Sequence, residues 1–226
     1  MKKVIVIAII SIFFFGTNIA FAGGLPNLGG LASCLSKGSS TDLCNLTSSR
    51  QQAIASYLAA TKELSISLEK AAEAFGVKEE VLKKLAAVDA LKEGNLSDSN
   101  IEKARKSSQE ANEIIKQKMQ STKAPSIEDK KLMAESMIHL AVAAQKEMLL
   151  VKEVQNLSNQ AQAAIKSASP MEIFKIKDIA LTAFVLVKNV PMDLGLTQNI
   201  LGSYIQYAKA NNISVPSNAT GLLKGD

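Results

Sequence analysis

The chain has 226 residues, of which 26 are Lys or Arg and 21 are Asp or Glu, and it contains one His, two Cys and no Trp. Only 4% of the residues are aromatic. A single imidazole excludes a histidine dyad, and so few rings argue against an aromatic-lined cofactor pocket. The composition is otherwise rich in Ala, Leu, Lys, Glu, Gln and Ser, which favours helices over a β-sandwich.

The first residues have the three parts of a secretory signal peptide. Two lysines follow the initial Met, residues 4–15 form an almost unbroken apolar run, and residues 20–22 (Ala-Phe-Ala) supply a small-x-small cleavage pattern. The run is well short of the roughly 20 residues that cross a bilayer. We therefore expect residues 1–22 to be a signal peptide that is cleaved between Ala22 and Gly23, which makes the protein periplasmic or secreted. An uncleaved N-terminal anchor is the alternative.

Residues 23–46 are predicted to be an irregular Gly/Ser-rich segment that carries both cysteines, Cys34 and Cys44. An oxidising compartment favours a disulfide between them. Closing this short loop would remove roughly 3 kcal/mol of unfolded-chain entropy. The alternative is acylation of Cys34, because residues 31–34 (Leu-Ala-Ser-Cys) resemble a bacterial lipobox.

Three amphipathic helices are predicted in the first half of the mature chain, because apolar side chains recur there every three or four positions. Gly76 is expected to end the first of them in a left-handed conformation. The predicted ranges are residues 47–75, with a cap at Thr47, Ser48 or Ser49; residues 78–92, stopped by Gly94-Asn95; and a helix from Ser97 or Ser99 to Gln120.

The fourth and longest pattern begins at Pro125-Ser126, with acidic residues in its first turn. Without a break it would run to Ser169 and measure about 65 Å. A compact globule of this size has a diameter of only roughly 43 Å. The helix is therefore expected to break at the polar residues 155–159, and an elongated molecule is the alternative.

Residues 173–190 are apolar almost all round, as in a helix surrounded by other helices. Pro191 is expected to end this helix, and a last amphipathic helix is predicted over residues 197–210. The sequence thus predicts an all-α fold: a single-domain bundle of six to seven helices over residues 47–211. Its apolar helix Ile173–Val190 is expected to be buried near the C-terminus, and residues 212–226 form a tail.

His139 and three methionines are the main candidates for a metal site, and a zinc site from His139 and the cysteines is less favoured because both cysteines are expected to be oxidised. Thioethers with an imidazole could bind Cu(I), but Met at helical spacing more often fills a core. His139 is expected to lie at the border of its helix, held by Glu135 one turn earlier. No metal, cofactor or catalytic residue is predicted. The methionines in question are Met133, Met137 and Met148.

The third helix carries charges of both signs, which is typical of a solvated face and not of a nucleic-acid surface. No nucleic-acid partner is predicted, and contact with an anionic surface or partner is the alternative interpretation of this helix. The charged residues are Glu102, Lys103, Arg105, Lys106, Glu110, Glu113, Lys116 and Lys118.

These patterns predict an exported, non-enzymatic helical binding protein of the bacterial envelope. Its expected partner is another envelope protein or an apolar small molecule, contacted through the third helix and the segment before the bundle. The alternative is a secreted membrane-active protein that permeabilises membranes by exposing the Ile173–Val190 helix, with peripheral membrane contact. A third class is an enzyme acting through Ser, Asp, Glu or Tyr, for which no residue stands out. The sequence does not distinguish a monomer from an oligomer.

Overall fold

The computed structural model describes residues 41–93, 96–122 and 124–222, and within them the only regular secondary structure is helical. The predicted all-α bundle is therefore confirmed. The predicted signal peptide, its cleavage site and Cys34 lie outside the described residues. The elements in chain order are α2 (Thr41–Ala74), α3 (Lys78–Asp89), the short 3₁₀ helix η1 (Ala90–Glu93), α4 (Asp98–Ser121), α5 (Ile127–Ser167), α6 (Pro170–Ala210) and α7 (Ser217–Gly221).

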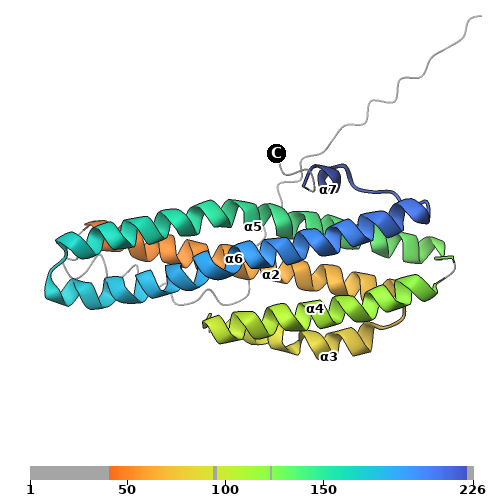
Figure 1. Cartoon of the computed structure of the whole chain (residues 1–226), viewed down its shortest axis with the longest axis horizontal. Helices are drawn as coiled ribbons and strands as arrows, with labels where there is room; N and C mark the ends of the chain where they lie inside the picture. Colours follow the sequence, from red (N-terminus) through yellow and green to blue (C-terminus); the bar gives the residue numbers. More distant parts are fainter. Residues whose placement is uncertain (1–40, 94–95, 123, 223–226) are drawn as a thin grey trace, which may run out of the picture.

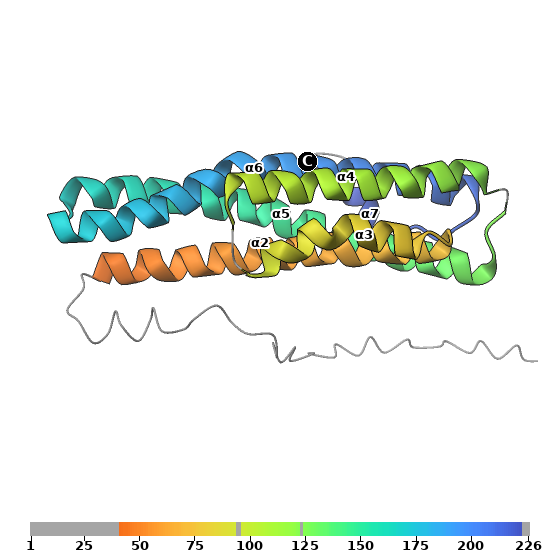
Figure 2. The same cartoon turned by 90° about the horizontal axis from the view of Figure 1, so that it is seen from below.

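Three long helices run the length of an elongated molecule. α5 and α6 have 41 residues each, which corresponds to about 60 Å, and α2 packs beside them with α5 antiparallel to both (Figure 1). α3 and α4 form a hairpin that lies along only one half of this bundle (Figure 2). The other half consists of the start of α2, the end of α5 and the start of α6, and we call it the three-helix end.

Several helix ends are confirmed at the predicted residues. Gly76 has a φ of 68°, and the Val77 amide donates to the Ala72 carbonyl, as expected for a left-handed cap. The side chain of Ser97 accepts from the Asn100 amide at the start of α4, and Ser126 forms a capping box at the start of α5. The first helix was predicted too short, because α2 begins at Thr41 rather than at residues 47–49.

The predicted break in the fourth helix is wrong, and α5 continues through residues 155–159 to Ser167. The polar residues there face solvent, while Val154, Leu157 and Ala161 keep the buried stripe in register on the other side. The polar patch is therefore an outer face of one helix and not a helix terminus. The elongated alternative is the observed one.

Pro191 does not end its helix, which was the second wrong boundary. α6 starts at Pro170 and includes both the predicted apolar helix and the predicted last helix. Pro191 itself is exposed, while Asn189, Val190 and Asp193 around it are buried. Because the proline ring points away from the neighbouring helices, the packed residues on either side can hold the helix together despite one missing hydrogen bond.

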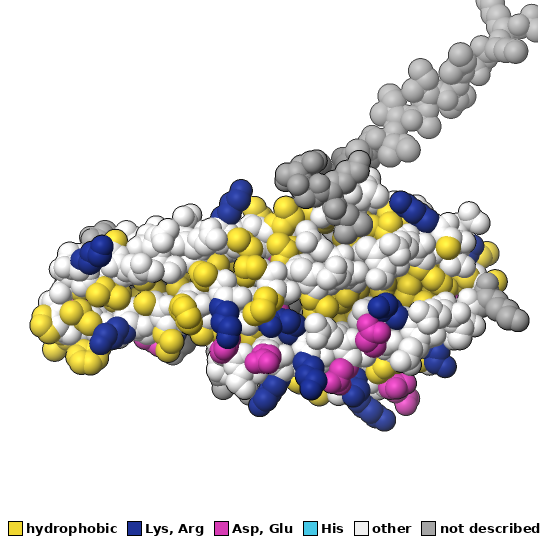
Figure 3. Space-filling view, viewed as in Figure 1, with side chains coloured by type: hydrophobic (Ala, Val, Ile, Leu, Met, Phe, Trp, Pro, Cys, Tyr) yellow, Lys and Arg dark blue, Asp and Glu magenta, His cyan; other side chains and the backbone are white. Residues whose placement is uncertain are grey.

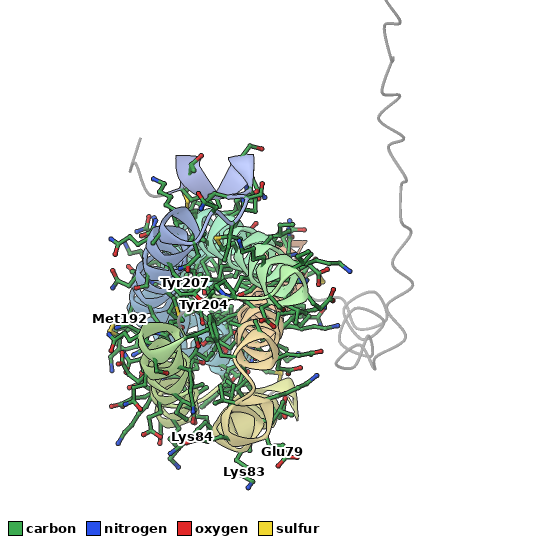
Figure 4. All side chains as sticks on the ribbon, turned by 90° about the vertical axis from the view of Figure 1, so that its right-hand side faces the viewer. Glu79, Lys83, Lys84, Met192, Tyr204 and Tyr207 are labelled. Carbon is green, nitrogen blue, oxygen red and sulfur yellow. The ribbon has the colours of Figure 1, made fainter. Side chains whose placement is uncertain are left out.

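The core is filled by side chains from all the long helices. Tyr204 of α6 is fully buried between the helices, whereas Glu79, Lys83 and Lys84 project from α3 into solvent (Figure 4). The predicted C-terminal tail is also partly ordered, since α7 packs against α5 and its Ala219 is buried.

Candidate functional site

A buried polar layer crosses the middle of the bundle and joins three helices. The Tyr57 hydroxyl of α2 donates to Asp193 Oδ2 of α6 at 3.0 Å. Arg105 of α4 donates from Nε to Asp193 Oδ1 at 2.5 Å and from Nη2 to Asn189 Oδ1. Asn189 and Asp193 are one turn apart on α6, so a single guanidinium reaches both. This layer fixes where α4 docks on α6.

The layer extends to the surface at the first residue of α4. Asp98 accepts from Lys188 Nζ at 2.6 Å and from Asn189 Nδ2 at 2.7 Å. The hydrogen bond from Asn189 and the Lys188 charge lower the pKa of the Asp98 carboxyl. The start of α4 is therefore tied to α6 at residues 188 and 189.

Burial changes the acid–base behaviour inside the layer. It raises the pKa of Asp193, which the Arg105 guanidinium lowers again in part. Burial and the neighbouring Asp193 carboxylate raise the pKa of Tyr57 far above its ordinary value. Tyr57 is therefore a fixed hydrogen-bond donor at any ordinary pH and not a proton-transfer group.

Glu147 of α5 is a buried carboxyl beside this layer. Its exposed fraction is 2%, and Oε2 has no hydrogen-bond partner among the described residues. Burial is the main cause that raises its pKa to about 8, the Asp193 charge adds to the effect, and the Thr197 hydroxyl offsets part of it. Glu147 is therefore mostly protonated at neutral pH.

Most of the polar layer is enclosed by the helices. A shallow hollow of about 610 Å³ lies beside it between α4 and α6. Met192 lines this hollow, and its side chain lies at the outside of the bundle in Figure 4. Arg105 is the one residue of the layer that also lines this hollow, while Tyr57, Asn189 and Asp193 are buried. The layer thus has the features of a structural latch between helices.

The most exposed apolar surface lies on α6 at the three-helix end. Met171, Phe174, Leu181 and Phe184 are 81%, 75%, 63% and 65% exposed. They recur at helical spacing along one side of α6, and we call them the apolar stripe. Single exposed apolar residues are ordinary, but four large ones on one helix face are typical of an interaction site.

The expectation that Ile173–Val190 is buried on every side is therefore wrong. Only one face of it packs into the core, through Ile176, Ile179, Ala183 and Leu186. The residues of this segment are apolar on all sides of the helix, but neighbouring helices cover only one of those sides. Because α4 begins at Asp98, opposite Lys188, the preceding part of α6 extends beyond the α3–α4 hairpin (Figures 1 and 2).

Basic side chains lie near the apolar stripe. Lys175 and Lys177 are on the same stretch of α6, with Lys177 Nζ 5.9 Å from the centre of the Phe174 ring. The Asp178 carboxylate is neutralised by Arg50 of α2, whose Nη1 lies 2.6 Å away. In Figure 3 this end carries apolar and basic side chains, whereas acidic ones gather mainly over α4.

The sequence-predicted metal candidates do not meet in one place. Met133 and Met137 are buried in the core, while Met148 is 39% exposed. His139 Nδ1 lies 2.7 Å from Glu63 Oε2 of α2, while the carboxylate of Glu135, one turn before His139, accepts from Lys70. Among the described residues, no group of three or more His, Cys, Asp and Glu side chains could hold a metal ion.

Cys44 lies within α2 and is half-buried, not in an irregular segment as predicted. Its expected partner Cys34 lies outside the described residues, so both the disulfide and the alternative acylation of Cys34 stay predictions.

Sequence reasoning placed Arg105 on the solvated face of the third helix, and this was wrong. Arg105 is largely buried in its pair with Asp193, although its neighbours Lys103 and Lys106 are exposed. A signal was present, because Asn189 and Asp193 are polar residues one turn apart on an otherwise apolar helix and require a partner. Nothing in the sequence indicated which cation supplies it.

One helix of the described residues, α6, is long and apolar enough to cross a membrane by length and composition. Its most apolar 18-residue window has a mean hydropathy of 1.5, and 33% of that window is buried in the bundle. The core helix of a soluble protein can be equally long and apolar, but it is mostly buried.

Comparison with known protein families, with curated proteins and with solved structures found no match to this chain.

Proposed function

We propose that this protein is an exported helical binding protein of the bacterial envelope that acts through the apolar stripe of α6. The single observation that carries the proposal is the exposure of Met171, Phe174, Leu181 and Phe184 on one helix face. Exposing such a surface to water is unfavourable, and binding a partner is favourable because it removes this apolar area from water. The signal-like N-terminus supports export to the envelope, and the exposed apolar stripe supports action by binding a partner.

A partner that covers the stripe fits better than an apolar small molecule held between helices. The central side chains Leu140, Leu150 and Leu186 are fully buried against their neighbours. The hollows at the three-helix end are open and lie between α2 and α5, with mostly polar linings such as Gln52, Asn156 and Gln160. An enclosed apolar ligand would need an apolar cavity.

Photocrosslinking in living cells tests this proposal. A photoreactive phenylalanine analogue at Phe184 is expected to give a defined adduct with a protein or with a lipid, because this position would face the partner. The same analogue at Asn159, an exposed residue of α5 at the same end, is the matched control. Equal adducts from both positions, or none from position 184, would contradict the proposal.

The second candidate is a membrane-permeabilising protein, and the length and hydropathy of α6 favour it specifically. This activity requires α6 to leave the bundle, which means separating its buried face from α5 and breaking the Arg50–Asp178 pair. Release of a trapped dye from anionic vesicles measures it. Complete retention of the dye at micromolar protein, also at mildly acid pH, rejects this candidate and leaves the first intact.

A further inference from the structure

We propose that the apolar stripe, together with the lysines beside it, is a docking site for an anionic bilayer surface, on which the three-helix end lies flat. This inference rests on the proposed function and names its partner. Three features of the described residues carry it: the shape of the surface, its charge and the anchoring of α6 in the bundle.

The stripe is an exposed face of one helix, and its residues line neither of the two hollows named at the three-helix end. The two hollows described at the three-helix end lie between α2 and α5, away from Phe174 and Phe184. A partner helix normally lays its apolar face into a groove between helices. A ridge of large apolar side chains instead suits the boundary between lipid headgroups and acyl chains, where amphipathic helices insert one face.

The charge around the stripe is complementary to acidic lipids. Lys175 and Lys177 are exposed within the same stretch of α6, and Lys166 is exposed at the end of α5, close to the turn into α6. The nearby Asp178 carboxylate is paired with Arg50. Lysines that flank inserted apolar residues place their ammonium groups at the headgroup level and are attracted to an anionic surface.

The size of the stripe and the anchoring of α6 favour docking without insertion of a whole helix. From Met171 to Phe184 the stripe is about 20 Å long, well below what a helix needs to span hydrocarbon. The opposite face of α6 stays in the core through Ile176, Ile179 and Ala183. The bundle can therefore remain closed while the stripe enters the interface.

Co-sedimentation of the mature chain with vesicles tests the inference. We expect binding to vesicles with about one third phosphatidylglycerol, and at least tenfold weaker binding to vesicles of phosphatidylcholine alone. The double variant F174S/F184S should bind anionic vesicles at least tenfold more weakly. K175E/K177E should lose a comparable factor, because it reverses the local charge.

The matched control is I127S/L149S, which removes two apolar side chains of α5 that are 89% and 64% exposed but lie outside the stripe. Its vesicle binding should stay within about twofold of the wild type. All three variants change exposed residues, so their helical circular dichroism and thermal midpoints should match the wild type and exclude misfolding.

Two outcomes overturn the inference: no binding of the wild type to anionic vesicles, or an equal loss in the stripe and control variants. If vesicle binding is absent while the analogue at Phe184 crosslinks to one protein in cells, the stripe is a protein-binding site. In that case the proposed binding function stands, and the inference that its partner is a bilayer is rejected. Absence of both signals removes both proposals.

Discussion

Replacing Glu147 with Gln is expected to stabilise the protein by about 4 kcal/mol at pH 8 and by much less near pH 4.5. The side chain is 2% exposed, and its pKa is raised from 4.5 to about 8, chiefly by burial. The folded state therefore keeps a proton on Glu147 over a pH range in which the unfolded chain has released it. Gln has nearly the same shape and no ionisation.

The sign follows from proton linkage. Between pH 4.5 and about 8 the folded protein holds one proton more than the unfolded chain at Glu147, so the free energy of unfolding falls as pH rises. The slope is about 1.4 kcal/mol per pH unit, which sums to about 4 to 5 kcal/mol over that range. Above about pH 8 this contribution no longer changes.

Denaturant unfolding of wild type and E147Q from pH 4.5 to 9 measures the effect. The difference in the free energy of unfolding between E147Q and the wild type should grow with pH and level off above about pH 8. E102Q, at an exposed residue of α4, is the control and should follow the wild type within about 0.5 kcal/mol. A difference between wild type and E147Q that does not vary with pH would refute the assignment.

Removing the Arg105 side chain is expected to cost about 3 to 5 kcal/mol at neutral pH. Arg105 is the cationic partner of the buried Asp193 carboxylate and also binds Asn189. Its loss leaves a charge in the interior without compensation, which is the most destabilising way to break a buried pair. The cost should shrink in acid, where Asp193 can take up a proton.

Three comparisons make this test specific. K103A changes an exposed cation on the same helix and should cost less than about 0.5 kcal/mol. The double variant R105M/D193L removes both charges and should recover part of the lost stability, although the buried Tyr57 hydroxyl loses its acceptor. Hydrogen exchange in R105A should rise first in α4, because its latch to α6 is lost. If R105A lost as little stability as K103A, the proposed role of Arg105 as the partner of the buried Asp193 would be contradicted.

Local features of this fold were predictable because they depend on neighbouring residues. Gly76, Ser97 and Ser126 terminate or start helices at the expected places. The errors arose at positions where tertiary packing, and not the local sequence, decides whether a helix continues. Pro191 suggested a helix end, and residues 155–159 suggested a break. Pro191 and the polar side chains of that segment face outward, while Leu157 within it keeps its place in the core.

The candidate surface could not be predicted, because composition does not give the number of neighbours of a helix. Residues 173–190 are apolar enough for the centre of a bundle, but α4 begins at Asp98, opposite Lys188. The part of α6 before that point therefore has a free side. The latch that sets this position depends on Arg105 and Asp193, which are far apart in the sequence.

The exposure of the apolar stripe in the resting molecule is the central claim, and a single tryptophan tests it most directly. The chain has no Trp, so F174W places the only indole on the stripe. We expect emission typical of an indole in water and efficient quenching by acrylamide, with a blue shift and protection once anionic vesicles are added. Blue-shifted emission that acrylamide does not quench in the free protein would contradict the account.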